Sequence, residues 1–367
     1  MDLDQKRRVE FADSLALARQ SVVSTRDLHR AGMTGRAIAA AVRSGSLTRL
    51  RTGWFVPASA WDAVKPDARH LTAVVAAQRV APSRIVFSHR SAATLHRLPV
   101  WSRWLADEPG PEDERWLSET RVVHTTGESG ARRVPEPSRV RHRESLSAAD
   151  VVRVDGFACT SIERTLFDIA RSEPFPIALA CIDEALRREV SRGRLVDRER
   201  WAAWRERMLG RARAYAGRPG ARAVRALALL ADPRADSPLE SGSRLRFLQC
   251  GIEVELQHEV FGADGRRYHL DFWLKRQNLF GECDGKIKYV DVELLNGRSA
   301  DDVFFAEKLR QDAVSGAIMM RGVRWAARHV VTGARFAAHL RSLGVEVPGR
   351  ATRVFGADVA GFLDALP

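Results

Sequence analysis

The first sixty residues alternate between helical and extended apolar spacing. Apolar positions recur with a helical period over 9–20, which predicts a first helix. Ser24 or Thr25 can cap a short second helix that ends at Gly32. Thr34 can cap a third, alanine-rich helix that glycine closes at position 45.

Two short alternating runs follow around Thr52-Gly53, which is the pattern of a β-hairpin. Helix, tight turn, helix and hairpin is the order of a winged helix-turn-helix. In that arrangement the apolar side chains expected to face the core are Ile38, Val42 and Leu47.

The middle of the chain mixes both periods and predicts an α/β region. Helices are expected over 68–80, 88–98 and 161–171, and strands over 84–87, 121–126, 139–143 and 150–160. Arg164 and Asp168 stand four residues apart on one predicted helix, so we expect an ion pair on its face. The local histidines fit no metal-ligand spacing and are expected to be core or solvated residues: His89, His96, His124 and His142.

Residues 176–231 have helical spacing, interrupted at Gly193, and are rich in arginine. The last third predicts the order helix, three strands, helix, strand, with a closing helix over 334–344. Its first helix has Ser237 as N-cap, proline at the first position and Glu240 at the third, which is a capping box. The three strands are expected over 252–261, 266–274 and 278–285, with a turn at 263–265, followed by a helix over 301–318 and a short strand over 322–330.

Composition excludes several classes of protein. The chain has 367 residues, of which 45% are hydrophobic, so disorder as the main state is excluded. No apolar run is long enough to span a membrane, and the charged N-terminus is not followed by an apolar stretch, so we expect neither a membrane protein nor a signal peptide. The four cysteines lie far apart, which indicates a reducing, cytoplasmic setting and no zinc finger.

The formal charge of +13 is concentrated in two blocks. Residues 1–60 carry +5 and residues 191–236 carry +7, whereas 61–190 sum to 0 and 237–367 to +1. One interpretation is simply an arginine-rich proteome. The other is that these blocks meet a polyanion such as DNA.

In the first block, the third helix would enter the major groove and offer Arg36 and Arg43. The hairpin would lay Arg49 and Arg51 along phosphates. A small helical domain with solvated arginines is the alternative. Similarly, the basic segment 176–236 is either a solvated connector or a phosphate-contacting element.

Residues 21–56, together with SHRSAATLHRLP (88–99) and TSIERTLFDIAR (160–171), resemble the AbiEi-type antitoxin family of actinobacteria. The similarity covers roughly the first half of the chain. It implies a winged helix joined to an α/β domain, and a transcriptional repressor of a toxin–antitoxin system with a cognate toxin as possible partner.

Acidic residues recur in the last third where buried strands are expected. Asp271 lies between Leu270 and Phe272, while Glu282 and Asp284 share one strand face. Buried carboxylates are unfavourable unless they are paired or bind a metal. With Lys286 and Lys288 directly after them, they form the pattern of a site in which carboxylate oxygens hold Mg²⁺, with Mn²⁺ as a substitute, and a lysine stabilises charge at phosphorus.

The span from Glu240 to about residue 345 resembles the PD-(D/E)XK nucleases, closest to the Vsr-like branch, in the SPLES, LDF and GECDGKIKY motifs. The resemblance implies metal ligands at Asp271 and Glu282, a third ligand or lysine substitute at Asp284, and a helix carboxylate at Glu240. The sequence departs from the family because Asp284 stands where E-x-K has its lysine. Lys286 is favoured over Lys288 as the catalytic lysine because it keeps the strand parity.

Each acid has a non-catalytic alternative. Capping alone explains Glu240, a strand-edge ion pair with Arg244, Arg246 or Arg267 explains Asp271, and a surface turn explains Glu282 with Asp284.

The sequence therefore predicts a multi-domain α/β chain. The expected parts are a winged helix over 1–60, an α/β domain over 61–175, a basic helical connector over 176–236, a PD-(D/E)XK restriction-endonuclease-like domain over 237–345 and a tail over 346–367. The leading hypothesis is a Mg²⁺-dependent DNA endonuclease in phage defence or DNA processing. The second is a DNA-binding repressor or antitoxin without catalysis.

Overall fold

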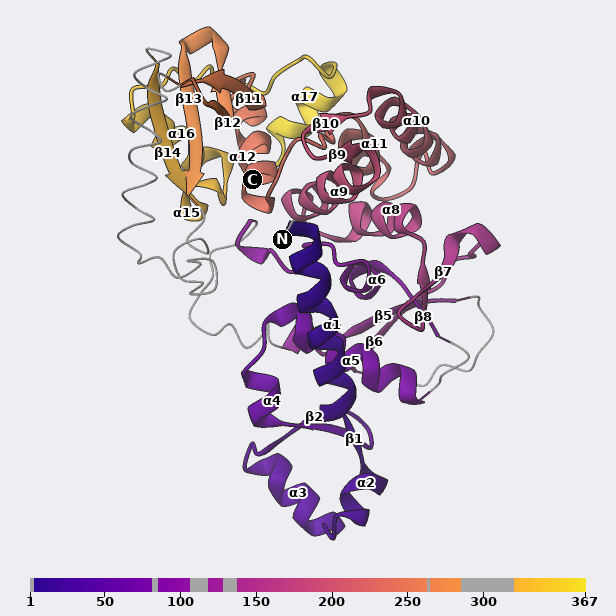
Figure 1. Ribbon diagram of the computed structural model, residues 1–367. Coiled ribbons are helices and arrows are strands. Elements are labelled where there is room, and N and C mark those ends of the chain that lie inside the picture. Colours follow the sequence, from indigo (N-terminus) through magenta and orange to yellow (C-terminus); the bar gives the residue numbers. More distant parts are fainter. Residues whose placement is uncertain (1–2, 81–84, 106–117, 128–136, 263–264, 285–319) are drawn as a thin grey trace, which may run out of the picture. The chain divides into compact units, whose positions relative to one another are not determined.

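A computed structural model describes residues 3–80, 85–105, 118–127, 137–262, 265–284 and 320–367 (Figure 1). The chain divides into two compact units. Unit 1 comprises Met1–Trp101 and Pro109–Ser172, and unit 2 comprises Ser102–Glu108 and Glu173–Pro367. The expected mixture of helices and sheets in more than one domain is confirmed. The five predicted segments are thus grouped into two bodies, and the short stretch 102–108 belongs with the second.

Unit 1 begins with α1 (Leu3–Ser21), β1 (Val23–Ser24), α2 (Thr25–Arg30) and α3 (Gly35–Arg43). The hydroxyl of Ser24 accepts from the backbone N of Asp27, and the carboxylate of Asp27 accepts from the backbone N of Ser24, so Ser24 is the cap. Thr34 caps α3 by accepting from the backbone N of Ala37. Both caps agree with the sequence.

The hairpin that follows consists of β2 (Leu47–Arg51) and β3 (Trp54–Pro57), which form a three-stranded sheet in the order β1-β3-β2. Gly53 in its turn has φ 75°, a conformation that glycine adopts without strain. A small core joins the helices to this sheet. It contains the three residues expected from the sequence, of which Ile38 is buried and Val42 and Leu47 are partly buried, packed with Leu28 and Phe55.

The rest of unit 1 is built on a five-stranded sheet in the order β6-β5-β4-β8-β7. Its strands are β4 (Val86–Phe87), β5 (Val123–Thr126), β6 (Arg139–His142), β7 (Val151–Val154) and β8 (Phe157–Thr160). The helices are α4 (Ala58–Asp62), α5 (Pro66–Val80), α6 (His89–Leu95) and α8 (Ile162–Ser172), with a 3-10 turn η2 at Ala148–Asp150.

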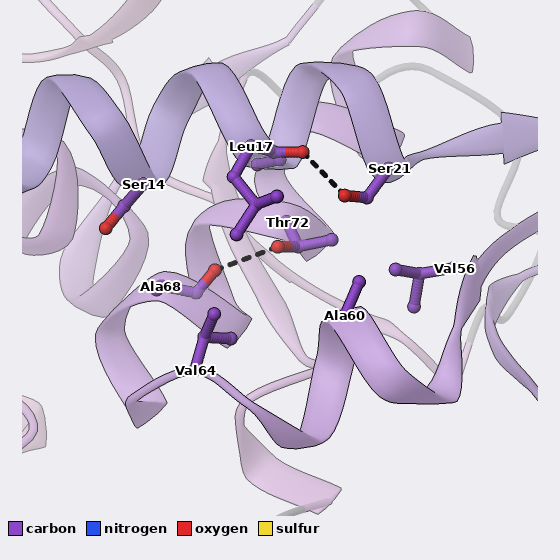
Figure 2. A pocket seen from close by; sticks show the side chains of 9 residues that line it. Ser14, Leu17, Ser21, Val56, Ala60, Val64, Ala68 and Thr72 are labelled. Carbon is purple, nitrogen blue, oxygen red and sulfur yellow. Dashed lines mark hydrogen bonds between the residues drawn. The ribbon is translucent and has the colours of Figure 1, made fainter.

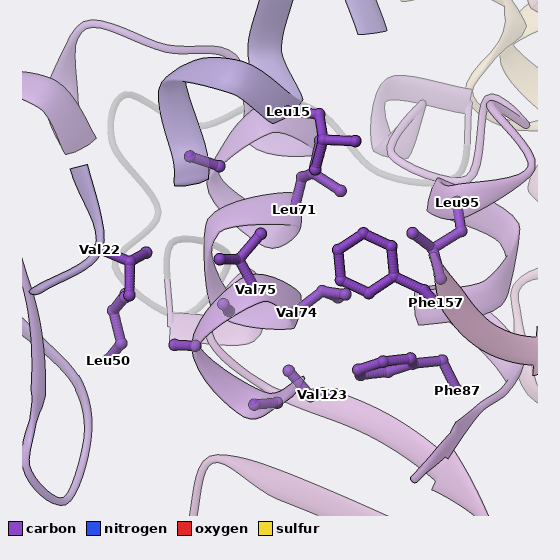
Figure 3. Packing of buried hydrophobic residues seen from close by; sticks show 14 of the residues in the cluster. Leu15, Val22, Leu50, Leu71, Val74, Val75, Phe87, Leu95, Val123 and Phe157 are labelled. Carbon is purple, nitrogen blue, oxygen red and sulfur yellow. The ribbon is translucent and has the colours of Figure 1, made fainter. Parts of the chain in front are cut away.

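The sequence 150–160, expected as one strand, is a hairpin of β7 and β8 turning at Asp155-Gly156. Helix α5 supplies the centre of the core. Leu71, Val74 and Val75 pack against Phe87 of β4 and Phe157 of β8 (Figure 3).

Unit 2 opens with helices α9 (Phe175–Val190), α10 (Arg198–Ala214) and α11 (Ala221–Leu230). Between α9 and α10 lies a two-stranded hairpin of β9 (Ser191–Arg192) and β10 (Leu195–Val196). Most of α9 is buried. This part of the predicted connector is therefore a core element of unit 2.

A four-stranded sheet in the order β11-β12-β13-β14 forms the rest of unit 2. Its strands are β11 (Glu255–Phe261), β12 (Arg267–Leu274), β13 (Leu279–Asp284) and β14 (Arg321–Ala326), with 3-10 turns η1 (Arg103–Leu105) and η3 (Lys275–Gln277). The first three strands are antiparallel neighbours, and β13 and β14 are parallel.

Helix α12 (Pro238–Gln249) packs on this sheet, together with α15 (Ala327–Val330) and α16 (Gly333–Ser342). The last four residues of the predicted strand 322–330 are the helix α15, and residues 346–367 include a further helix, α17 (Ala357–Asp364), which contacts α12. The predicted turn at 263–264 and the predicted helix over 301–318 lie outside the described residues.

Candidate active site in unit 2

Glu240 lies in the first turn of α12 and is 6% exposed. Its backbone N donates to the hydroxyl of Ser237 at 3.2 Å, as the capping pattern predicts. The carboxylate accepts from the Ser237 hydroxyl at 3.0 Å, from the backbone N of Asp236 at 3.0 Å and from Nε2 of Gln257 at 2.9 Å. Capping therefore accounts for part of its environment, and the bond to Gln257 of β11 goes beyond capping.

Asp271 is the second carboxylate at this point. Burial raises the pKa of Glu240 to about 7, and the negative charge of Asp271 contributes to the rise. Oδ2 of Asp271 also accepts from the backbone N of Cys283 at 3.3 Å. The backbone pairing of β12 with β13 begins at Phe272, which pairs with Gly281. The Asp271 side chain thus reaches the backbone of β13 beyond the last backbone pair.

The arginines considered as partners of Asp271 have other contacts. Arg244 binds Asp183 at 3.0 Å, and Arg267 lies 3.7 Å from Glu259. The guanidinium of Arg246 donates to the carbonyl of Val330 at 2.8 Å.

Gln257 is a residue of this site that the sequence analysis did not identify. It has φ 53°, a left-handed conformation that is rare for a non-glycine residue within a strand. The β11–β12 ladder pairs Leu256 with Phe272 and His258 with Leu270, so Gln257 stands opposite Asp271 where backbone pairing is interrupted. Backbone outliers of this kind concentrate at functional sites because the surrounding structure must hold them.

Glu282 is 6% exposed and lies within β13, so this residue is not in a surface turn. Its neighbour in the parallel ladder is Arg324 of β14, and Nη2 of that arginine donates to Oε2 of Glu282 at 2.6 Å. A buried carboxylate is thus neutralised by a charge-assisted hydrogen bond. Nothing local in the sequence pointed to Arg324, since the two residues are paired only through the parallel register.

The remaining predicted site residues are described only in part. Asp284 ends β13 opposite Ala326, but its side chain lies outside what the structure describes, as do Lys286 and Lys288 entirely. Within the described residues there is no group of three or more His, Cys, Asp or Glu side chains that could hold a metal ion. Asp271 and Glu282 supply hard carboxylate oxygens, which fit Mg²⁺ in kind because this ion binds through one or two carboxylates plus water.

Arg194 extends from the β9–β10 hairpin to the same place. Its Nη1 donates to Oε1 of Gln257 at 2.5 Å and lies 3.6 Å from Asp236. The Arg194 charge is also one of the causes that lower the pKa of His269, after burial. The hairpin, β11 and the start of α12 are therefore joined through Arg194, Gln257 and Glu240.

Of the four arginines predicted to contact DNA, three are exposed: Arg36, Arg43 and Arg49. The guanidinium of Arg49 lies over the ring of Phe55, 5.7 Å from its centre. Arg51 is only 7% exposed and is engaged in an interaction of its own. The structure therefore does not present Arg51 on the surface where a phosphate contact requires it.

The histidines of unit 1 form a packed cluster. The rings of His89 and His142 stack with centres 3.4 Å apart, and Nδ1 of His124 lies 3.1 Å from Nε2 of His142. Burial lowers the pKa of His89 to about 2 and that of His124 to about 3. The predicted pair of Arg164 with Asp168 is present at 2.9 Å. These contacts agree with core histidines and an ion pair on the helix.

A pocket between α1, α4 and α5 of unit 1 offers no ligand site. Its volume is about 10 Å³, room for one water molecule. The hydroxyls of Ser21 and Thr72 donate to carbonyls of their own helices (Figure 2).

In the described part of the chain, no helix has the length and apolar character needed to cross a membrane.

No family model matches the chain. Two uncharacterized proteins from two strains of Mycobacterium tuberculosis are each 32% identical to it over 125 residues. The matched segment makes up 34% of this chain and 42% of each relative, so the chain matches less than half the length of these proteins.

Proposed function

We propose that this protein is a Mg²⁺-dependent DNA endonuclease with its own DNA-targeting domain. The observation that carries the proposal is that three carboxylates lie on neighbouring elements of unit 2. They are Glu240 of α12, Asp271 of β12 and Glu282 of β13, and Asp271 accepts a hydrogen bond from the backbone of Cys283, the residue after Glu282. Buried and partly buried carboxylates on neighbouring elements are unfavourable for folding, so their presence on the two central strands of the sheet and on α12 favours a functional site over packing.

The residues of the site divide the work. Glu240 and Gln257 would position the site, because the Glu240 carboxylate accepts hydrogen bonds both from the start of α12 and from Gln257 of β11. Asp271 and Glu282 would be the metal ligands, with Asp284 as a third oxygen donor. Bound Mg²⁺ would act as a Lewis acid toward the scissile phosphate and lower the pKa of a coordinated water.

Arg324 is relevant to this function because it donates a hydrogen bond to Glu282, which would also be a metal ligand. A guanidinium at 2.6 Å places a fixed positive charge next to the carboxylate. In a nuclease, such a charge can stabilise the developing charge at phosphorus, the role that Lys286 or Lys288 has in our interpretation of the sequence.

The targeting domain in this proposal is the start of unit 1, interpreted as a winged helix. Helices α2 and α3 followed by the β2–β3 hairpin support that interpretation, and Arg36 and Arg43 are exposed on α3. Exposed arginines on a second helix of this kind are suited to the major groove.

Cleavage of supercoiled plasmid in Mg²⁺ or Mn²⁺ tests the proposal. We expect Asp271→Ala and Glu282→Ala each to reduce nicking by about 100-fold or more, as for loss of a key electrostatic group. Glu253→Ala is the matched control, since this acid of unit 2 is exposed and pairs only loosely with Arg276 at 3.5 Å. Equal activity in wild type, Asp271→Ala and Glu282→Ala would sink the proposal.

The second candidate function is a DNA-binding repressor or antitoxin without catalysis. It is favoured by the Glu282–Arg324 pair, because an arginine that neutralises the carboxylate can replace a metal as its counter-charge. Footprinting on the DNA upstream of its own gene tests the sequence-selective binding that this candidate requires. Arg36→Ala with Arg43→Ala should abolish protection, whereas Arg153→Ala, an exposed arginine elsewhere in unit 1, should preserve it.

A further inference from the structure

The β9–β10 hairpin is joined to the candidate site by the bond of Arg194 to Gln257. Leu195 pairs with Arg192 and Val196 with Ser191. At its base the backbone N of Asp197 donates to the carbonyl of Val190 at 2.8 Å, which ties the hairpin to the end of the buried helix α9. Its turn is therefore held in place relative to unit 2.

The exposed side chains of this hairpin are unusual for a surface turn. Arg192, Arg194 and Leu195 are all exposed, and Leu195, at 80%, is the most exposed large hydrophobic residue in the described part of the chain. A single exposed leucine is ordinary by itself. Beside Arg192 and Arg194, the second of which reaches the acidic site, it completes a surface with both charge and apolar area.

Arg194 connects the hairpin to the candidate site. Its guanidinium bonds to Gln257, and Gln257 in turn bonds to Glu240. The two bonds fix the Gln257 amide, with the oxygen toward Arg194 and the nitrogen toward the carboxylate. The backbone of Gln257 has a left-handed conformation, which is unfavourable for a non-glycine residue, so the surrounding contacts must stabilise it.

The ion pair between Arg194 and Asp236 is weak. Asp236 lies 3.6 Å away, and the two side chains are 51% and 39% exposed. Exposed pairs of this geometry contribute little because water and salt screen them. A phosphate can therefore take the place of Asp236 at small energetic loss, and it offers the guanidinium two oxygens in a matching plane.

We propose that the Ser191–Val196 hairpin grips the DNA backbone beside the acidic residues of unit 2, with Arg194 binding a phosphate and Leu195 packing against the adjacent deoxyribose. This inference rests on the proposed function for its ligand, DNA. It assigns to the basic segment 191–196 a direct contact with the strand next to the site of cleavage.

The test is equilibrium binding of a labelled 20-base-pair duplex to the full chain, measured by fluorescence anisotropy without divalent metal. Arg36→Ala and Arg43→Ala are present in every protein, so that the N-terminal helices contribute little. Arg194→Ala should weaken binding about tenfold, as for a lost charge-assisted hydrogen bond. It should also reduce the slope of log Kd against log salt by about one.

Two comparisons exclude a merely structural effect. Arg194→Lys should keep the salt slope, and Arg200→Ala, an exposed arginine on α10, should change neither quantity. Because Leu195 is solvent-exposed, Leu195→Glu should weaken binding and Leu195→Arg should tighten it, both with unchanged melting temperature. Unchanged affinity in Arg194→Ala and in both Leu195 variants would overturn the inference, as would absence of any binding by the background protein.

This experiment is independent of cleavage. If the Arg194 and Leu195 effects are found but wild type never nicks DNA, the endonuclease proposal fails and the DNA-gripping hairpin stands. If wild type cleaves DNA but these variants bind it normally, the hairpin inference fails and the endonuclease proposal stands.

Discussion

Replacing Arg324 by glutamine would leave Glu282 as a buried carboxylate without its closest counter-charge. The Glu282 side chain is 8% exposed and that of Arg324 is 31% exposed, with 2.6 Å between the bonded atoms. Removing one partner of a buried pair typically costs about 3–5 kcal/mol, because the remaining charge stays desolvated. Since Arg324 is partly solvated, we expect the lower end, about 3 kcal/mol.

The assay is thermal unfolding followed by circular dichroism. For a unit of this size, about 3 kcal/mol corresponds to a decrease of roughly 6–12 °C in Tm. Arg225→Gln is the matched control, because its pair with Asp358 has a similar distance, 2.9 Å, but side chains that are 54% and 79% exposed. We expect that control to lose less than about 1 kcal/mol.

The double variant Glu282→Gln with Arg324→Gln should recover most of the loss, because no buried charge is left unpaired. A decrease in Tm for Arg324→Gln no larger than that of Arg225→Gln would refute the reasoning. A double variant as unstable as Arg324→Gln alone would do the same, since the loss would then come from packing.

The same variants report on metal binding. If Glu282 is a ligand, Mg²⁺ should raise the Tm of Arg324→Gln more than that of wild type, since the ion no longer competes with the Arg324 guanidinium for the carboxylate. The double variant should lose that response. An equal effect of Mg²⁺ on all three proteins would argue against Glu282 as a ligand.

Three further predictions concern the fold and the candidate site. Gly281→Ala should destabilise unit 2 by about 1–3 kcal/mol, since its Cβ would lie 2.5 Å from the Trp325 ring, whereas Gly210→Ala in the open part of α10 should not; chemical denaturation measures both. Gln257→Gly should relieve the left-handed backbone but reduce nicking, and retained activity would contradict a positioning role. The free energy of unfolding should fall as the pH drops below 6.5, because histidines with a folded pKa of about 2 or 3 stay neutral in the folded protein while the same histidines take up protons in the unfolded chain. Each such histidine contributes about 1.4 kcal/mol per pH unit. Thermal melts of His89→Asn should show a smaller dependence on pH, and an unchanged dependence would contradict the prediction. The histidines concerned are His70, His89 and His124.

The parts of the fold that could be predicted are those determined over a few residues. Ser24, Thr34 and Ser237 all cap the helices expected of them, because capping joins a side chain to a backbone group only two or three positions away. The hairpin turn at Gly53 follows from the same kind of local rule.

The parts that could not be predicted depend on pairing across the chain. Arg324 meets Glu282 only because β13 and β14 are parallel in one register, 42 residues apart in sequence. Gln257 reaches Glu240 only because β11 leaves the extended conformation at that residue. Alternation along 252–261 predicts a regular strand and gives no sign of that departure.

Arg51 illustrates why composition alone overstates a basic surface. Four arginines in and before the hairpin were expected to contact DNA, but the register of β2 with β3 buries Arg51 and leaves Arg49 exposed. Conversely, arginines placed in a connector by sequence include Arg194, which is beside the acidic residues. The electrostatic argument for DNA therefore depends on individual positions: Arg36 and Arg43 at one surface and Arg194 at another each predict a separate contribution to the salt dependence of binding.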